Sequence, residues 1–241
     1  MTLRSDLADQ VLTLRLDRPK RLNAIDEATA GALLEALQRA DDAVDVRVVV
    51  LRGSGRAFSA GRDVSEAPTP AILALVQDVA RAIVALSKPV VAAVHGWVVG
   101  AGVEWMLDAD IVVAARSARF KLPEIGLGVF VTGGVTLTLP HYAGLARAKG
   151  LLLLGEEFSA ADALQWGLVW SVVDDAALDA EVARVAARLA GFDPRAVGRF
   201  KRVLNAIDLD RFEVALRTEA RMQTELEAPV AGVGKGTRAR P

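Results

Sequence analysis

The chain has 241 residues, 52% of them hydrophobic and 24% charged, which is enough apolar material for one domain with a small appendage. Lys and Arg total 29 against 30 for Asp and Glu, so the net charge of −1 creates no global field that would attract nucleic acid or an anionic membrane. The sequence contains no cysteine and only two histidines, which excludes disulfides and thiol nucleophiles and disfavours a histidine metal site or a Ser–His triad. Chemistry must therefore rest on carboxylates and backbone groups, and we expect no metal or redox cofactor.

The N-terminal segment lacks the features of a targeting or membrane signal. It carries Arg4, Asp6 and Asp9 without an apolar core, and no run in the chain approaches the roughly 18 apolar residues that a spanning helix needs. These features predict a cytoplasmic protein.

The first half of the chain alternates strands with helices. Residues 11–17 alternate apolar and polar as a half-buried strand does, and Asp26 is placed to cap a helix that runs to about Ala40. The further predicted elements are buried strands at 46–51, 90–94 and 111–115, a helix at 70–86, a short helix opening near Gly100 and a short strand at 119–121. This repetition of strand and helix favours a spiral over an open doubly wound sheet.

Helical signals dominate the second half. The predicted helices cover 144–154, 160–166 after Ser159, 176–190 after Asp175, about 194–205 after Asp193, and 212–225, with a short strand at 169–173. We expect a core over residues 1–190, a C-terminal helical region over 191–227 and a mobile tail over 228–241, which has no apolar periodicity.

Two glycine-containing loops, 57–63 and 95–104, each follow a buried strand. Small residues let the backbone approach a ligand closely, and an N–H at the start of a helix is unpaired and lies at its positive end. The two loops could therefore direct two donors at one oxygen. The alternative is that each glycine serves only a tight turn.

Four segments, in this order and at this spacing, resemble the crotonase superfamily, the enoyl-CoA hydratase/isomerase family. They are 18–24 (RPKRLNA), 57–63 (AFSAGRD), 88–104 (KPVVAAVHGWVVGAGVE) and 120–128 (FKLPEIGLG), and the resemblance runs from about Val11 to Leu226. It implies an α/β spiral of repeated ββα units followed by a helical C-terminal region. It also implies an acyl-CoA substrate and assembly as a homotrimer or homohexamer.

The resemblance assigns an oxyanion hole and two catalytic carboxylates. The backbone N–H groups of Arg62 and Ala101 would bind the thioester oxygen, and removing one such donor typically costs about 2.7–4 kcal/mol in the barrier. Glu104 would help to activate water and Glu124 would deliver a proton to the α-carbon. Two carboxyls in one apolar pocket titrate as a pair with one pKa raised, which suits acid and base work near neutral pH.

Coenzyme A is expected along the basic loop 18–24, which supplies the local positive charge that the whole chain lacks. The residues that the resemblance assigns to CoA binding are Arg18, Lys20, Arg21, Leu22 and Ala60. The alternative for this loop is a solvated turn.

Because both glutamates are present, the favoured reaction is hydration of a 2,3-enoyl-CoA. Isomerisation of the double bond, decarboxylation, dehalogenation and thioester hydrolysis use the same oxyanion hole and remain open. Outside catalysis, the chain could be an acyl-CoA binder or an RNA-binding relative, although the balanced charge argues against RNA and the two glutamates argue against a dead enzyme.

The sequence departs from the hydratase pattern in three places. A Pro-Gly-Ala-Gly-Gly-like turn after Gly128 is replaced by the apparently shorter VFVTGG of 129–134, and bulky Trp105 follows the catalytic position. The family's usual C-terminal helix is cut short after Ala228, which predicts a lid over the acyl group that is reduced or borrowed. We expect His95 and His141 to be structural.

Overall fold

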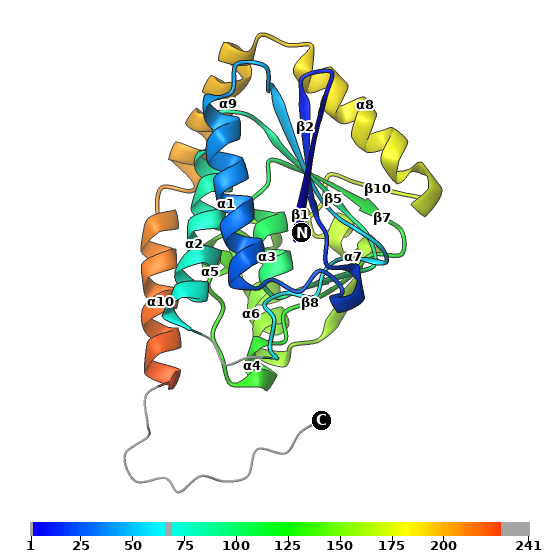
Figure 1. Ribbon diagram of the computed structural model, residues 1–241. Helices are drawn as coiled ribbons and strands as arrows, with labels where there is room; N and C mark the ends of the chain where they lie inside the picture. Colours follow the sequence, from blue (N-terminus) through cyan, green and yellow to red (C-terminus); the bar gives the residue numbers. More distant parts are fainter. Residues whose placement is uncertain (1, 66–68, 228–241) are drawn as a thin grey trace, which may run out of the picture.

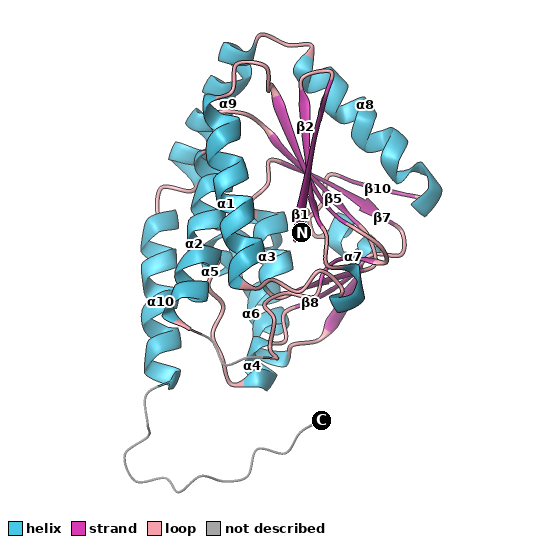
Figure 2. Cartoon of the chain, in the orientation of Figure 1, coloured by secondary structure: helices cyan, strands magenta, loops and turns pink. Residues whose placement is uncertain are grey.

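The computed structural model describes residues 2–65 and 69–227, and its strands form two sheets (Figures 1 and 2). The larger sheet has six strands in the order β1-β2-β3-β5-β7-β10. Their bounds are Leu3–Ala8 (β1), Val11–Leu16 (β2), Val48–Gly53 (β3), Val90–Val94 (β5), Ile111–Ala115 (β7) and Ser171–Val173 (β10). All neighbours pair in parallel except β1, which forms an antiparallel hairpin with β2.

Both faces of the larger sheet are covered by helices, and this explains why its central strands are almost entirely apolar. Alternate residues such as Val48, Val91 and Val113 contact α8 (Leu178–Ala190), which crosses one face of the sheet in Figure 1. The residues between them face the main core, which is shared with α1 (Glu27–Asp42) and α2 (Pro70–Ala85).

Each of three long strands leads into a short strand of the second sheet. That sheet contains β4 (Ala57–Ser59), β6 (Trp97–Val99), β8 (Arg119–Lys121) and β9 (Glu157–Ser159), in the order β4-β6-β8-β9. A helix follows each short strand of the first three: α2, α3 (Ala101–Leu107) and α4 (Glu124–Leu127). The predicted spiral of ββα units is thereby confirmed, and the end of every unit lies at the same edge of the molecule.

The second half of the chain is helical, as predicted. Its helices are α5 (Val135–Ala143), α6 (Leu145–Leu154), α7 (Ala160–Gln165), α8, α9 (Pro194–Asp208) and α10 (Phe212–Glu227). A 3-10 turn at Asp175–Ala177 precedes α8, and another lies near the N-terminus at Pro19–Arg21. Asp26, Ser159 and Asp193 cap their helices as expected. Asp175 was expected to cap a helix, but its carboxylate accepts from the Ser117 N–H, so it ties the turn to another loop.

Several elements differ from the sequence prediction because local patterns do not encode them. The strands β1, β4, β6 and β9 and the helices α4 and α5 were not predicted, and all are short or carry residues typical of loops. The predicted mobile tail, 228–241, lies outside the described residues. Within 2–65 and 69–227, no helix is long and apolar enough to cross a membrane.

Candidate active site

The basic loop is held in place by one amide side chain at its end. Asn23 is fully buried in a left-handed conformation (φ 56°), and its Nδ2 donates to the carbonyl oxygens of Ser54 and Ala57, both at 2.8 Å. Its own carbonyl accepts from Ser59 Oγ at 2.9 Å. Asn23 therefore fastens the loop 18–24 to β4, the strand that leads into the first glycine loop.

The two glycine loops lie close together just after the strands β4 and β6. Gly61 (φ 79°) and Gly100 (φ 52°) adopt conformations that favour glycine. A Cβ added at Gly61 would lie 2.6 Å from the Val99 carbonyl oxygen and 3.5 Å from the Ala101 nitrogen, so only glycine allows this approach. Arg62 and Ala101 consequently line one cavity, and the predicted oxyanion hole needs both residues there.

Glu104 lies one turn into α3, and only 1% of its surface is exposed. Its Oε1 accepts from the Thr132 N–H at 3.2 Å. Gly133 lies so close that an added Cβ would be 2.7 Å from Glu104 Oε2. Burial raises the pKa of Glu104 well above its ordinary value, and the neighbouring carboxyls of Glu124 and Glu219 raise it further.

Glu124 opens α4 and points toward the start of α3. A Cβ added at Gly100 would lie 2.7 Å from Glu124 Oε1, while Oε2 is buried and has no hydrogen-bond partner among the described residues. Burial raises the pKa of Glu124 to about 7, although its own backbone N–H and the Arg62 charge act in the opposite direction. A carboxyl with this pKa can donate or accept a proton near neutral pH.

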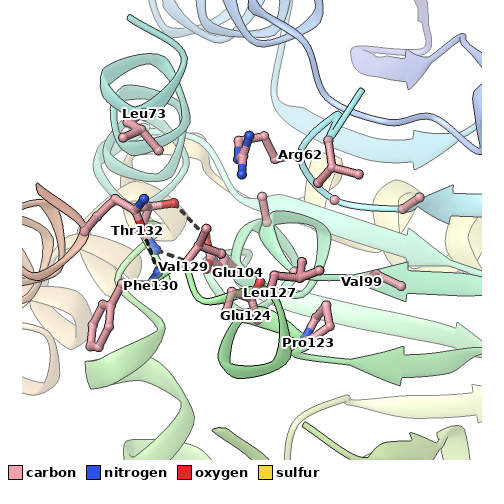
Figure 3. A pocket seen from close by; sticks show the side chains of 16 residues that line it. Arg62, Leu73, Val99, Glu104, Pro123, Glu124, Leu127, Val129, Phe130 and Thr132 are labelled. Carbon is pink, nitrogen blue, oxygen red and sulfur yellow. Dashed lines mark hydrogen bonds between the residues drawn. The ribbon is translucent and has the colours of Figure 1, made fainter. Parts of the chain in front are cut away.

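The two glutamates share a single cavity with both glycine loops (Figure 3). Figure 3 shows the Arg62 side chain across the cavity from the Glu104 and Glu124 carboxyls. Apolar side chains form most of the remaining wall, and one polar residue comes from the C-terminal helix. These residues are Val64, Leu73, Val99, Leu127, Val129, Phe130 and Gln223. The arrangement can hold an apolar acyl group beside two titratable carboxyls.

The residues predicted to bind CoA differ in their exposure and in the contacts that they make. Arg18 forms ion pairs with Asp26 (3.2 Å) and Asp63 (3.0 Å), so carboxylates outside the loop already balance its charge. Lys20 and Arg21 are exposed at the surface. The partly buried Leu22, in a left-handed conformation (φ 51°), ends the 3-10 turn, and Ala60 lines the cavity of the glutamates.

The third carboxylate of this region, Asp63, serves the loop itself. Hydrogen bonds from the Ser65 hydroxyl and N–H, helped by Arg18, lower its pKa to about 2. Asp63 is therefore a fixed anion that orients Arg18 and accepts hydrogen bonds within its own turn.

Two departures noted in the sequence have structural explanations. Trp105 is fully buried in the core, where its indole N–H donates to the Val76 carbonyl at 3.1 Å, so it faces away from the ligand cavity. The C-terminal helix is present to Glu227 as α10, and its Gln223 lines the cavity of its own chain. α10 therefore contributes to the cavity wall, whereas the expected reduction of the lid beyond Ala228 concerns residues outside the described part of the chain and stays a prediction.

Sequence reasoning gave no role to four residues that build the site. Thr132 contacts Glu104, Gln223 and Glu219 on α10 hold the loop before α5, and Asn23 holds the basic loop. Asn23 stood in a motif of the family resemblance, and Thr132 stood in the VFVTGG segment noted as a departure, but neither was given a role. The others become visible only when segments distant in the sequence are brought together.

A fold of ββα units that brings two glycine loops and two carboxyls with raised pKa values to one cavity is typical of an enzyme. The family model for enoyl-CoA hydratase/isomerase matches residues 6–236. The 1,2-epoxyphenylacetyl-CoA isomerase of Escherichia coli K12 is 36% identical over 87% of this chain and 84% of its own length. A probable enoyl-CoA hydratase of Rhodobacter capsulatus is 35% identical over 93% of this chain and 89% of that protein.

Solved structures agree with these relatives. An enoyl-CoA hydratase from Mycobacterium avium subsp. paratuberculosis K-10 superposes with a TM-score of 0.91 at 34% identity, over 95% of both chains. The chain belongs to the crotonase superfamily, in the enoyl-CoA hydratase/isomerase family.

Proposed function

We propose that the protein adds water across the 2,3 double bond of an enoyl-CoA to give a 3-hydroxyacyl-CoA. The observation that carries this proposal is the pair Glu104 and Glu124, one buried and one partly buried, which line one cavity and whose pKa values are both raised by desolvation. Hydration needs one group that accepts a proton from water and one that donates a proton to carbon. A pair that shares one proton near neutral pH supplies both.

The reaction divides between the two carboxyls. Water attacks the β-carbon and gives a proton to Glu104, while the electrons of the double bond move to the α-carbon and the thioester oxygen. That oxygen becomes an enolate, which the N–H groups at Arg62 and Ala101 stabilise. Glu124 then gives its proton to the α-carbon, so that the net change is the addition of one water molecule.

The second candidate is isomerisation of the double bond. It is favoured by the turn after Gly128, which departs from the hydratase pattern, and the matching family includes isomerases as well as hydratases. An isomerase needs only a proton shuttle between two carbons, which one carboxyl can perform.

The product formed in ¹⁸O-labelled water separates the two candidates. For hydration, the wild type should form labelled 3-hydroxyacyl-CoA, and Glu104→Gln and Glu124→Gln should each lower kcat by roughly 10² or more. An unlabelled product with a shifted double bond, and activity that survives Glu124→Gln, would establish isomerisation instead. Mass spectrometry of product from a panel of enoyl-CoA thioesters measures both outcomes.

We propose further that the chain assembles as a trimer or as a dimer of trimers through α9. This helix exposes a row of large apolar side chains that the single chain leaves uncovered: Phe200 (73% exposed), Ile207 (69%), Leu204 (57%) and Val203 (53%). Phe200→Glu should dissociate the assembly in sedimentation velocity, whereas Val44→Glu, at an apolar residue exposed on a loop, should not. A wild-type monomer at micromolar concentration would refute this assembly.

A further inference from the structure

The C-terminal helix buries two polar side chains one turn apart. Glu219 is fully buried and Gln223 is 1% exposed, although most of α10 is polar and lies at the surface. A buried carboxylate is costly unless hydrogen bonds satisfy it, so its partners indicate what the residue does. Both side chains face the segment 129–136, which joins α4 to α5.

Glu219 binds the first turn of α5. Its Oε2 accepts from the Gly134 N–H at 2.7 Å, and its Oε1 accepts from the N–H (2.8 Å) and hydroxyl (2.6 Å) of Thr136. The free N–H groups of a helix N-terminus are natural partners for a carboxylate. No side chain of α5 or of its N-cap Gly134 performs this capping, so the acceptor comes from 83 residues further along the chain.

Gln223 binds the same segment at the cavity that contains Glu104 and Glu124. Its Oε1 accepts from the Phe130 N–H at 2.5 Å, and Gln223 lines the cavity of the two glutamates. Between Phe130 and Gly134 lies Thr132, whose N–H donates to Glu104. The contacts from α10 therefore bracket the residue that holds the catalytic carboxyl.

α10 is itself firmly attached to the core. The ring of Phe212 lies so close to Gly134 that an added Cβ would be 2.3 Å from the ring, and Leu216 is fully buried. Gln77 Nε2 on α2 donates to the Leu216 carbonyl at 2.7 Å. A helix fixed in this way can hold the neighbouring loop in one conformation, although that loop contains two adjacent glycines.

We infer that Glu219 and Gln223 are positioning residues: they clamp the segment 129–136 so that the Thr132 N–H holds Glu104 in its reactive orientation. The clamp supplies from α10 the rigidity that the VFVTGG segment lacks in its own sequence. The kinetic part of this inference rests on the proposed hydration, whereas the clamp itself can be measured without turnover.

The test compares Glu219→Gln and Gln223→Met with Glu225→Gln in the full chain. Glu225 lies on the same helix with its side chain 62% exposed, so its neutralisation matches the chemical change without touching the segment. Because Glu219 lies outside the loop 18–24 that is predicted to bind CoA, Glu219→Gln should lower kcat on the order of 10²-fold and leave KM within a factor of about two. Gln223→Met should lower kcat less, and Glu225→Gln should behave as wild type.

Amide hydrogen exchange followed by mass spectrometry provides the second readout. In Glu219→Gln, peptides that cover 129–136 should exchange at least about 10-fold faster, while peptides from β5 and β7 keep wild-type protection. If Glu219→Gln does not give a stable protein, Thr136→Val removes only the hydroxyl contact and should produce a smaller change of the same kind.

The possible failures can be told apart. Unchanged exchange in 129–136, a loss of protection spread over all strands, or a kcat within twofold of wild type would overturn the clamp. A wild type that hydrates no enoyl-CoA would instead refute the proposed function, and local exchange in Glu219→Gln would then decide the clamp alone.

Discussion

Two groups of ionisable side chains near α3 differ in whether an opposite charge lies beside the buried member. In the first group, Lys201 on α9 forms an ion pair with Asp110 at 2.8 Å and donates to the carbonyls of Ile83 (2.9 Å) and Lys88 (3.2 Å). In the second group, Glu104 is buried near Glu124 and Glu219, and all three are acids. The first group is compensated by opposite charge, and the second is not.

The consequence is visible in the pKa of each group. Burial lowers the pKa of Lys201, but the Asp110 carboxylate offsets part of that effect, and both groups can remain charged. For Glu104, burial and neighbouring charge act in the same direction and raise the pKa. Compensated charges of this kind stabilise a fold, whereas like charges forced together are a feature of catalytic sites.

The largest expected effect comes from breaking the compensated pair. Lys201→Met should destabilise the protein by about 3 kcal/mol, because it leaves the Asp110 carboxylate, only 20% exposed, without its cation. Denaturant unfolding followed by circular dichroism measures this loss. The control is Arg195→Met on the same helix, where the ion pair with Asp193 is exposed to solvent and its loss should leave the unfolding midpoint unchanged.

A double variant refines this test. Lys201→Met combined with Asp110→Asn removes both charges and should recover part of the stability. A single Lys201→Met protein as stable as wild type would show that the pair is not a structural charge pair, and the comparison above would fail.

The second effect is smaller and opposite in sign. Because the pKa of Glu104 is raised in the folded protein, wild-type stability falls as pH rises above the unfolded value of 4.5 toward the folded pKa. Glu104→Gln imitates the protonated acid and escapes this loss. Its Tm should match wild type near pH 5 and exceed it by about 2–4 °C at pH 8, which corresponds to about 1 kcal/mol.

Differential scanning calorimetry at a series of pH values measures this gain. Glu157→Gln is the control, since that carboxyl is an exposed partner of Arg119 outside the cavity. A Tm difference for Glu104→Gln that shrinks as pH rises would contradict the assignment of an uncompensated acid.

Much of the fold could be predicted because burial leaves a local signature. The strands β5 and β7 were predicted to the residue, since strands covered on both faces are continuous apolar runs. The caps Asp26 and Ser159 carry their own helix signals. By contrast, β4 and β6 are three residues long and exist because they pair with each other, a contact that no local pattern records.

The helix α5 was missed for a different reason. It starts after Gly134 in a left-handed conformation and contains Pro140, and both residues usually indicate a break. Its start is stabilised by Glu219 from α10, which lies 85 residues away from Gly134 in the sequence. An isolated reading of 129–143 could not have found a helix that depends on so distant a cap.

The residues of the site were likewise predicted where a sequence motif marks them and missed where they depend on distant contacts. The sequence identified Arg62, Ala101, Glu104 and Glu124, and the structure brings all four to one cavity. Their roles came from family resemblance, because spacing alone could not show that the two loops meet. The supporting residues Thr132 and Gln223 stayed unassigned, since Gln223 reaches its partner Phe130 across 93 residues.

The smallest expected effect concerns two positive charges that are exposed to solvent, unlike those of Lys201 and Glu104. Lys20 and Arg21 are exposed in the loop that the family resemblance assigns to CoA, and solvent screens such charges strongly. Lys20→Gln with Arg21→Gln should raise KM about 5-fold, weaken its dependence on salt, and leave kcat nearly unchanged, because phosphate contacts are equal in the ground and transition states.

Lys149→Gln with Arg39→Gln is a control of equal charge, since neither residue lines the cavities at the site. A pantetheine thioester, which lacks the nucleotide phosphates, should have the same KM with the Lys20 and Arg21 variant as with wild type. If KM for that truncated substrate rises as well, or if kcat falls alone, the two side chains act on the reacting acyl group and not on the phosphates.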